Sequence, residues 1–320
     1  MNFYLAPPVI QAQIFVRIPD ALRCTGQPTE WKGGSALPSS EIFLEGPTYF
    51  NGNLYVTDIP YGRVLKIDSQ KQVSECVRYD GEPNGTAMRA DGTILVADYK
   101  QVCLNFILSL ARMLRKQGLL LFDPSKGEIS PFLTRRNLER FKGPNDLIVS
   151  SKNEVYFTDQ GQTGITDQTG CVYRLFPDGR LDCLVSNGVS PNGIALSPDE
   201  RFLYVAMTRS NSVWRLPLNS DGSTTKAGLF FQSFGCAGPD GLAFDEEGNL
   251  FICHPSLGSV FVVDADGAPK ARIVSAIGGG KNLTNCTFGG EDGKTLFITD
   301  SIQGNIQTVR WHCRGAVRMK

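Results

Sequence analysis

The chain has 320 residues, of which 41% are hydrophobic and 20% charged, a composition typical of soluble globular proteins. Lys plus Arg and Asp plus Glu each number 32, so no charge excess favours nucleic acid or an anionic membrane as a partner. We therefore expect a small-molecule substrate, with no nucleic acid, no membrane and no obligate protein partner.

Cysteine and histidine usage narrows the chemistry further. The nine cysteines form no C-x-x-C pair, which is typical of buried thiols in a reducing compartment. The only histidines are His254 and His312, so a histidine-rich zinc site is excluded. The N-terminus lacks a signal-peptide pattern, and the apolar stretch near residues 104–114 is too short and interrupted to span a bilayer. We expect a cytoplasmic protein.

One unit recurs six times along the chain. The units begin EGPTYFNGNLYVTD, PNGTAMRADGTILVADY, PNDLIVSSKNEVYFTD, PNGIALSPDERFLYVAM, PDGLAFDEEGNLFICH and TNCTFGGEDGKTLFITD. We interpret each as a turn of the P-[ND]-G type, an alternating strand, a second turn, and a second strand that mostly ends in Asp.

Third and fourth strands complete the units. The third strands are GRVLKID, GLLLFD, GCVYRLF, NSVWRLP, GSVFVVD and GNIQTVR, and EISPFLT, LDCLVSN and ARIVSAI are examples of fourth strands. Four antiparallel strands in each of six units, without helical periodicity, predict an all-β, six-bladed β-propeller. We expect one domain spanning residues 1–320.

One polar residue opens each unit and is called its anchor here. The anchors are Glu45, Asn84, Asn145, Asn192, Asp240 and Asn285, at spacings of 39, 61, 47, 48 and 45 residues. The longest spacing contains a 16-residue insertion at about 102–117, and it becomes 45 without that insertion. The inserted segment is either a helical lid on the face that carries the anchors or an unspliced intron.

The last unit ends after its third strand, near Trp311. The segment Gln11–Ile18 alternates like a fourth strand, and we predict that it pairs with Gly304–Arg310 and closes the ring. The alternative is a disordered N-terminal tail.

In a propeller the innermost strands begin around one end of the axis, so the anchors should face one another there. Glu45, Asn145, Asn192 and Asp240 would supply two carboxylates and two amide oxygens. Such hard ligands suit one divalent cation, most readily Ca²⁺ but also Mg²⁺, Mn²⁺ or Zn²⁺. Asn-Gly and Asp-Gly also form turns, so one anchor alone would indicate only a turn, whereas four equivalent positions favour a metal site.

The ends of the second strands should surround the same opening. Among them we expect Tyr99, Asp159 and His254 to contact the substrate, together with Asp146, which follows an anchor. The repeated Thr-Asp pairs could instead be structural and hold neighbouring turns. No G-x-S-x-G, P-loop or G-x-G-x-x-G motif stands in the required strand–helix context, which excludes the enzyme classes built on those motifs.

These anchors resemble those of the gluconolactonase family, also called the senescence marker protein or regucalcin family. The resemblance covers Glu45 to Arg310 and is carried by LEGP, GPNDL, YFTDQGQTG, SPNGIALSPDE and GPDGLAFDEEGNL. It implies a six-bladed propeller with one catalytic divalent cation that hydrolyses lactones or, in some relatives, organophosphates. Metal ligation is implied for Glu45, Asn192 and Asp240, and metal or substrate contact for Asn145.

The resemblance also implies that Asp240 is the catalytic acid/base, and Asp146 and Glu45 are alternative proton acceptors. Sugar-lactone members carry Arg at the position of Gly143, and this departure argues against gluconolactone itself and leaves room for a less polar lactone. The leading hypothesis is therefore a metal-dependent lactonase. The alternatives are a phosphotriester hydrolase of the diisopropyl fluorophosphatase type and a non-catalytic calcium-binding or protein-interaction propeller.

Overall fold

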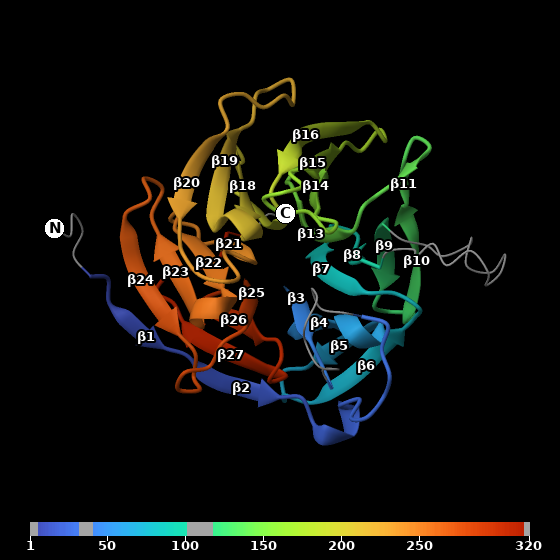
Figure 1. Cartoon of the computed structure of the whole chain (residues 1–320). Helices are drawn as coiled ribbons and strands as arrows, with labels where there is room; N and C mark the ends of the chain where they lie inside the picture. The colour runs from blue at the N-terminus through green and yellow to red at the C-terminus, as the bar shows by residue number, and fades with distance from the viewer. Residues whose placement is uncertain (1–5, 32–40, 101–117, 317–320) are drawn as a thin grey trace.

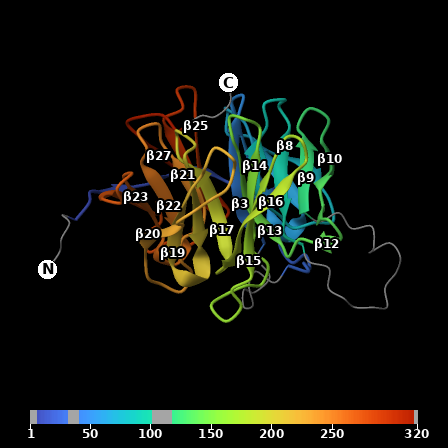
Figure 2. The ribbon, with the colours of Figure 1, turned by 90° about the horizontal axis from the view of Figure 1, so that it is seen from above.

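The computed structural model describes residues 6–31, 41–100 and 118–316. Six twisted sheets, each with four or fewer antiparallel strands from its own unit, stand around a central axis, which confirms the predicted six-bladed propeller (Figure 1). Figure 2 shows the ring edge-on, with the inner strands β3 and β17 in the middle of the molecule. No helix in the described part of the chain is both long and apolar enough to cross a membrane.

The first three blades follow one another in chain order. Blade one contains β3 (Leu44–Phe50), β4 (Asn53–Asp58), β5 (Arg63–Ile67) and β6 (Val73–Arg78). Blade two contains β7 (Pro83–Met88), β8 (Ile94–Asp98), β9 (Gly118–Asp123) and β10 (Glu128–Leu133). Blade three contains β13 (Pro144–Val149), β14 (Val155–Asp159), β15 (Gly170–Leu175) and β16 (Leu181–Gly188), and the small hairpin β11 (Arg135–Arg136) and β12 (Glu139–Arg140) precedes it.

The other three blades complete the circle. Blade four contains β17 (Pro191–Leu196), β18 (Phe202–Met207), β19 (Ser212–Pro217) and β20 (Gly228–Gln232). Blade five contains β21 (Leu242–Phe244), β22 (Leu250–His254), β23 (Ser259–Val263) and β24 (Pro269–Val274). Blade six contains β25 (Leu283–Gly289), β26 (Thr295–Asp300) and β27 (Asn305–Arg310). Short 3₁₀ turns are η1 (Asp20–Leu22), η2 (Ile59–Tyr61), η4 (Thr208–Ser210) and η5 (Pro255–Leu257).

The N-terminal segment belongs to two blades. β2 (Gln13–Arg17) pairs antiparallel with β27, with Gln13 opposite Thr308, and is the fourth strand of blade six. Immediately before it, β1 (Val9–Gln11) pairs in parallel with β24 and adds a fifth strand to blade five. Sequence alternation did not indicate this second pairing.

The insertion predicted at 102–117 lies outside the described residues. The strands on either side of it are described, and Asp98 of β8 stands directly opposite Gly118 of β9. The register predicted for blade two is therefore the observed one.

The hydrophobic core lies between neighbouring sheets. Phe157 and Tyr173 of blade three, for example, pack in one cluster with Leu95 and Leu119 of blade two. Burying a side chain of this size stabilises the fold by roughly 1.5–3 kcal/mol. Because each blade is covered by the next, the inner strands are held rigidly around the axis.

Candidate active site

Five of the six anchors line one cavity of about 330 Å³ at one mouth of the axis. They are Glu45, Asn84, Asn145, Asn192 and Asp240. The sixth anchor, Asn285, donates its amide N–H to Glu45 Oε2 at 3.0 Å and supports the cluster from behind. The four predicted metal ligands thus share a single cavity.

The anchors point inward because the inner strands are irregular where the anchors occur. The register with the second strand shifts between Glu45 and Thr48, and equivalent shifts follow Pro144 and Pro191. A bulge of this kind re-aims a side chain that would otherwise follow the alternation of the strand. Asn145 and Asn192 lie within β13 and β17, so the interpretation of these segments as turns was wrong.

The glycine after an anchor is required by crowding at the axis. A Cβ atom on Gly193 would lie 2.0 Å from the carbonyl oxygen of Asp240, and one on Gly85 would lie 2.2 Å from Asp146 Oδ1. Adjacent blades therefore touch through backbone at these points, and only glycine fits.

Threonines of the second strands link neighbouring blades. Thr57 Oγ1 donates to the carbonyl oxygen of Asn84 at 2.8 Å, and Thr158 Oγ1 donates to that of Asn192 at 2.7 Å. Each bond runs from one blade to the anchor of the next.

The cavity floor concentrates negative charge. Burial raises the pKa of Glu45, and burial together with the charges of Glu45 and Asp146 raises the pKa of Asp240 well above its usual range, against an opposing effect of Arg209. Glu45 is 4% exposed, and its Oε2 accepts from the backbone N–H of Gly46 at 2.9 Å. Two buried carboxylates that line one cavity, with the charge of Glu45 raising the proton affinity of Asp240, favour a cation between them.

The two amide anchors, Asn145 and Asn192, line the same cavity. Asn145 donates its Nδ2 to Gln160 Oε1 at 3.0 Å, and Gln160 donates in turn to Ser190 Oγ at 2.8 Å. With its N–H engaged in this way, the carbonyl oxygen of Asn145 is the group left for a ligand. Two carboxylates and two amides form a donor set that fits Ca²⁺ or Mg²⁺.

The cavity wall contains residues that the repeat did not reveal. Arg209 stands at its edge, and among the described residues no hydrogen bond or ion pair holds its guanidinium. Trp31, from the segment before blade one, lines the cavity and packs on Phe43 with ring centroids 4.8 Å apart. Arg209 follows Met207 and Thr208 at the end of a second strand. Because these strand ends were expected to surround the opening, the sequence could have indicated Arg209 as a cavity residue. Trp31 lies outside the repeat, and no pattern in the sequence indicated it.

Of the four residues expected at the substrate, Tyr99 lines the cavity. Its hydroxyl donates to the carbonyl of Gly161 and accepts from Gln162 Nε2, both at 2.7 Å, so its ring forms a fixed wall. Removal from water raises its pKa.

Asp159 and His254 lie away from this cavity. Asp159 accepts hydrogen bonds from the backbone N–H groups of Gly143 at 2.7 Å and Lys142 at 3.0 Å. His254 is fully buried, hydrogen-bonded to Ser233 at 3.1 Å, and burial lowers its pKa. Asp58 accepts from the backbone of Phe43 in the same way as Asp159, so the aspartates of these Thr-Asp pairs hold neighbouring loops.

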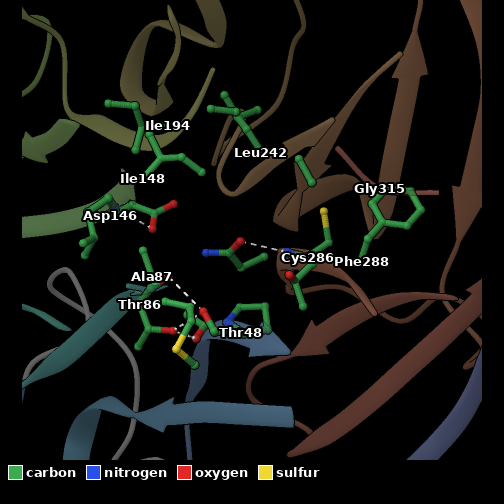
Figure 3. A pocket seen from close by; sticks show the side chains of 18 of the residues that line it. Thr48, Thr86, Ala87, Asp146, Ile148, Ile194, Leu242, Cys286, Phe288 and Gly315 are labelled. Carbon is green, nitrogen blue, oxygen red and sulfur yellow. Dashed lines mark hydrogen bonds between the residues drawn. The ribbon is translucent and has the colours of Figure 1, made fainter. Parts of the chain in front are cut away.

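Asp146 points into a second cavity of about 230 Å³ near the axis, shown in Figure 3. Its Oδ1 accepts from the backbone N–H of Leu147 at 2.9 Å. Burial, with the nearby Glu45 charge, raises the pKa of Asp146 to about 7. Gly315 and Ala316, near the C-terminus, line the same cavity.

Fold and site together define a six-bladed propeller with an acidic, oxygen-rich pocket at one mouth of its axis. The chain belongs to the family described as the SMP-30/Gluconolactonase/LRE-like region, which residues 43–302 match. It is 35% identical to a gluconolactonase of Zymomonas mobilis over 299 residues, which is 83% of this chain and 78% of that protein. It is 27% identical to the lactonase drp35 of Staphylococcus aureus over 239 residues, 72% of this chain and 69% of the relative.

Solved structures share the fold. A gluconolactonase of Xanthomonas campestris superposes with a TM-score of 0.70 at 24% identity, covering 93% of this chain and 94% of the other. A calcium-binding regucalcin of Agrobacterium tumefaciens superposes with a TM-score of 0.70 at 22% identity, covering 99% and 98%.

Proposed function

We propose that this protein is a lactone hydrolase that uses one divalent cation held by Glu45, Asn145, Asn192 and Asp240. The observation that carries the proposal is the convergence of two carboxylates and two amides in one cavity. The burial of Glu45 and Asp240 in one cavity supports it, because burial raises the pKa of both carboxyl groups and a bound cation would offset their charge. The names of the relatives, gluconolactonase and lactonase, support the reaction class.

When bound, the cation would supply Lewis acidity to the lactone carbonyl and acidify a nearby water. Asp240 is the residue that we assign as proton acceptor, because it is the acidic anchor that remains partly open to the cavity. Glu45 is enclosed by Gly46 and Asn285 and is better suited to holding the cation. Asp146 lines the second cavity, which favours Asp240 over Asp146 as the base.

The wall of the cavity favours a lactone with an apolar part. A Cβ atom at Gly143 would lie 3.2 Å from the ring of Tyr99. The ring of Tyr99 therefore occupies the space that a longer side chain at position 143 would need. Trp31, Phe43 and Ile59 extend the apolar wall. Arg209 is then the group available to a polar or anionic substituent.

The test is hydrolysis of a panel of sugar, aliphatic and aryl-substituted lactones by the full chain, before and after EDTA treatment. We expect turnover that EDTA abolishes and that added Ca²⁺ or another divalent ion restores, with aliphatic or aryl lactones preferred over gluconolactone. Lactone hydrolysis that persists unchanged in EDTA would refute the role of the cation. Absence of hydrolysis with every lactone and every ion would refute the reaction class.

A further inference from the structure

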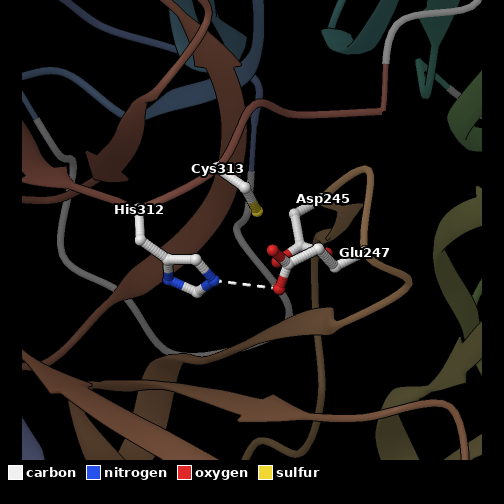
Figure 4. A group of neighbouring side chains, drawn as sticks. All are labelled: Asp245, Glu247, His312 and Cys313. Atoms are coloured by element: carbon white, nitrogen blue, oxygen red, sulfur yellow. Dashed lines mark hydrogen bonds and ion pairs between the residues drawn. The ribbon is translucent and has the colours of Figure 1, made fainter.

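Four potential metal ligands converge far from the candidate active site. They are Asp245 and Glu247, in the turn between β21 and β22, and His312 and Cys313, which follow β27. One donor atom from each lies within 4.8 Å of the others. In Figure 4 the imidazole of His312 faces Glu247, and the sulfur of Cys313 points towards Asp245.

The two halves of the cluster come from different blades, and backbone bonds already bring them together. Glu246 N–H donates to the carbonyl of Arg314, and Ala316 N–H donates to that of Phe244, both at 2.9 Å. Gly315 and Ala316 also line the second cavity, so this C-terminal segment covers one side of it.

The carboxylate of Asp245 is buried and precisely oriented. Its Oδ2 accepts from Trp311 Nε1 at 2.9 Å and from Asn249 Nδ2 at 2.7 Å, while Oδ1 accepts from the backbone N–H of Asn249 at 2.8 Å. Fixed outer hydrogen bonds of this kind orient carboxylates that bind metals.

His312 and Glu247 form the open side. Nε2 of His312 lies 3.0 Å from Glu247 Oε2, and both side chains are more than half exposed. Cys313 is 5% exposed, and burial and the Asp245 carboxylate raise the pKa of its thiol. A buried thiol beside two carboxylates and an imidazole is an arrangement that a thiophilic cation would stabilise.

We propose that Asp245, Glu247, His312 and Cys313 form a structural Zn²⁺ site that fastens the C-terminal segment to blade five. Thiolate, imidazole and carboxylate in a closed four-ligand set suit zinc, in contrast to the all-oxygen set at the axis. Ligands of tetrahedral zinc lie about 3.3–3.8 Å apart. The observed upper limit of 4.8 Å between donor atoms exceeds this range by about 1 Å, so a small adjustment of side chains would complete the site. Binding releases the Cys313 proton to solvent, so affinity rises with pH.

Cobalt substitution provides a direct test, because a thiolate–Co²⁺ bond gives a near-ultraviolet charge-transfer band that oxygen ligands do not give. The full chain, stripped with EDTA and kept reduced with a phosphine, is titrated with Co²⁺ and then with Zn²⁺. With Ca²⁺ added to fill the site at the axis, we expect a band that saturates at one equivalent of Co²⁺ and disappears when Zn²⁺ is added. Zn²⁺ should also raise the melting temperature.

Two variants and two controls make the result specific. Cys313→Ser should lose the band, and exposed His312→Ala should weaken Co²⁺ binding by at least the roughly 10–100-fold typical of losing a supporting partner. Cys236→Ser, at an exposed thiol outside the cluster, should behave as wild type. Asp240→Asn should also keep the band, so the outcome is independent of the lactonase proposal. Absence of the band in the wild-type chain, or a band that survives in Cys313→Ser, would overturn the assignment.

Discussion

The variant Asp146→Asn tests whether Asp146 or Asp240 acts as the general base. The substitution keeps an oxygen that can accept from the backbone N–H of Leu147 and removes the buried charge. Because Asp146 lines the second cavity rather than the one that holds Asp240, we expect lactone turnover to fall by less than tenfold. Loss of a true general base costs roughly 10²–10⁴-fold.

The same variant should stabilise the metal-free protein at alkaline pH. The pKa of Asp146 is raised from 3.8 to about 7, so the folded state binds the proton more tightly than the unfolded state. The free energy of unfolding therefore decreases as the pH rises from about 4 to about 7, because the buried carboxyl group of Asp146 must lose its proton in the folded state. Above that range the destabilisation by the Asp146 charge is complete. About 3 pKa units at 1.36 kcal/mol each give an upper bound of roughly 4 kcal/mol.

Urea denaturation of the EDTA-treated proteins at pH 5 and pH 8 measures this difference. We expect the stabilisation by Asp146→Asn to be several-fold larger at pH 8 than at pH 5. Added Ca²⁺ should shrink it, because a cation near Glu45 lowers the pKa of Asp146 as well. A variant that is less stable than wild type at pH 8, or a difference independent of pH, would refute the electrostatic reasoning.

Other changes test the remaining assignments. Asp240→Asn should lose roughly 10²–10⁴-fold in kcat even at saturating metal, because the proton acceptor is removed. The activity of Glu45→Gln should instead be partly rescued by added metal. If saturating metal restored Asp240→Asn to near wild-type turnover, Asp240 would be a metal ligand only. Arg209→Gln should raise KM for lactones with an anionic substituent and leave KM for neutral lactones within about twofold, because its guanidinium is a cation that lines the cavity. Equal effects on both would argue against this role. Deleting residues 1–18 should expose the edges of β27 and β24 and cause aggregation measurable by light scattering, while a monomeric, equally stable product would contradict it. Replacing residues 102–117 with a short glycine-rich link should leave the melting temperature within a few degrees, since Asp98 and Gly118 are already paired.

The repeat is what made fold and anchors predictable from sequence. Alternation and spacing recur in each unit, so an error in one blade is corrected by the other five, and Glu45, Asn145, Asn192 and Asp240 could be placed by equivalence alone. Inference from the repeat failed where one sequence pattern, Asn-Gly or Asp-Gly, can have two different structural causes. The Asn-Gly and Asp-Gly pairs suggested turns, yet the glycines are needed because adjacent blades touch at the axis.

Residues outside the repeat could not be found in this way. Trp31 lines the cavity from the segment before blade one, so periodicity carries no information about it. Arg209 follows a second-strand end, a repeated position, but the other blades carry different residues there. Asp159 and His254 occupy repeated second-strand ends, but whether such a side chain turns to the cavity or to the loop beside it depends on its partner. That partner is a backbone N–H group for Asp159 and the Ser233 hydroxyl for His254, and neither pairing follows from the repeat.

The pairing of β2 with β27 has a consequence for biosynthesis. Gln13 is made 295 residues before its partner Thr308, so at a translation rate of 5–20 residues per second it waits roughly 15–60 s. During this time five blades can form on the ribosome while the ring stays open. The nascent protein then carries two unsatisfied sheet edges, which makes the interval before release the period in which chaperone binding matters most.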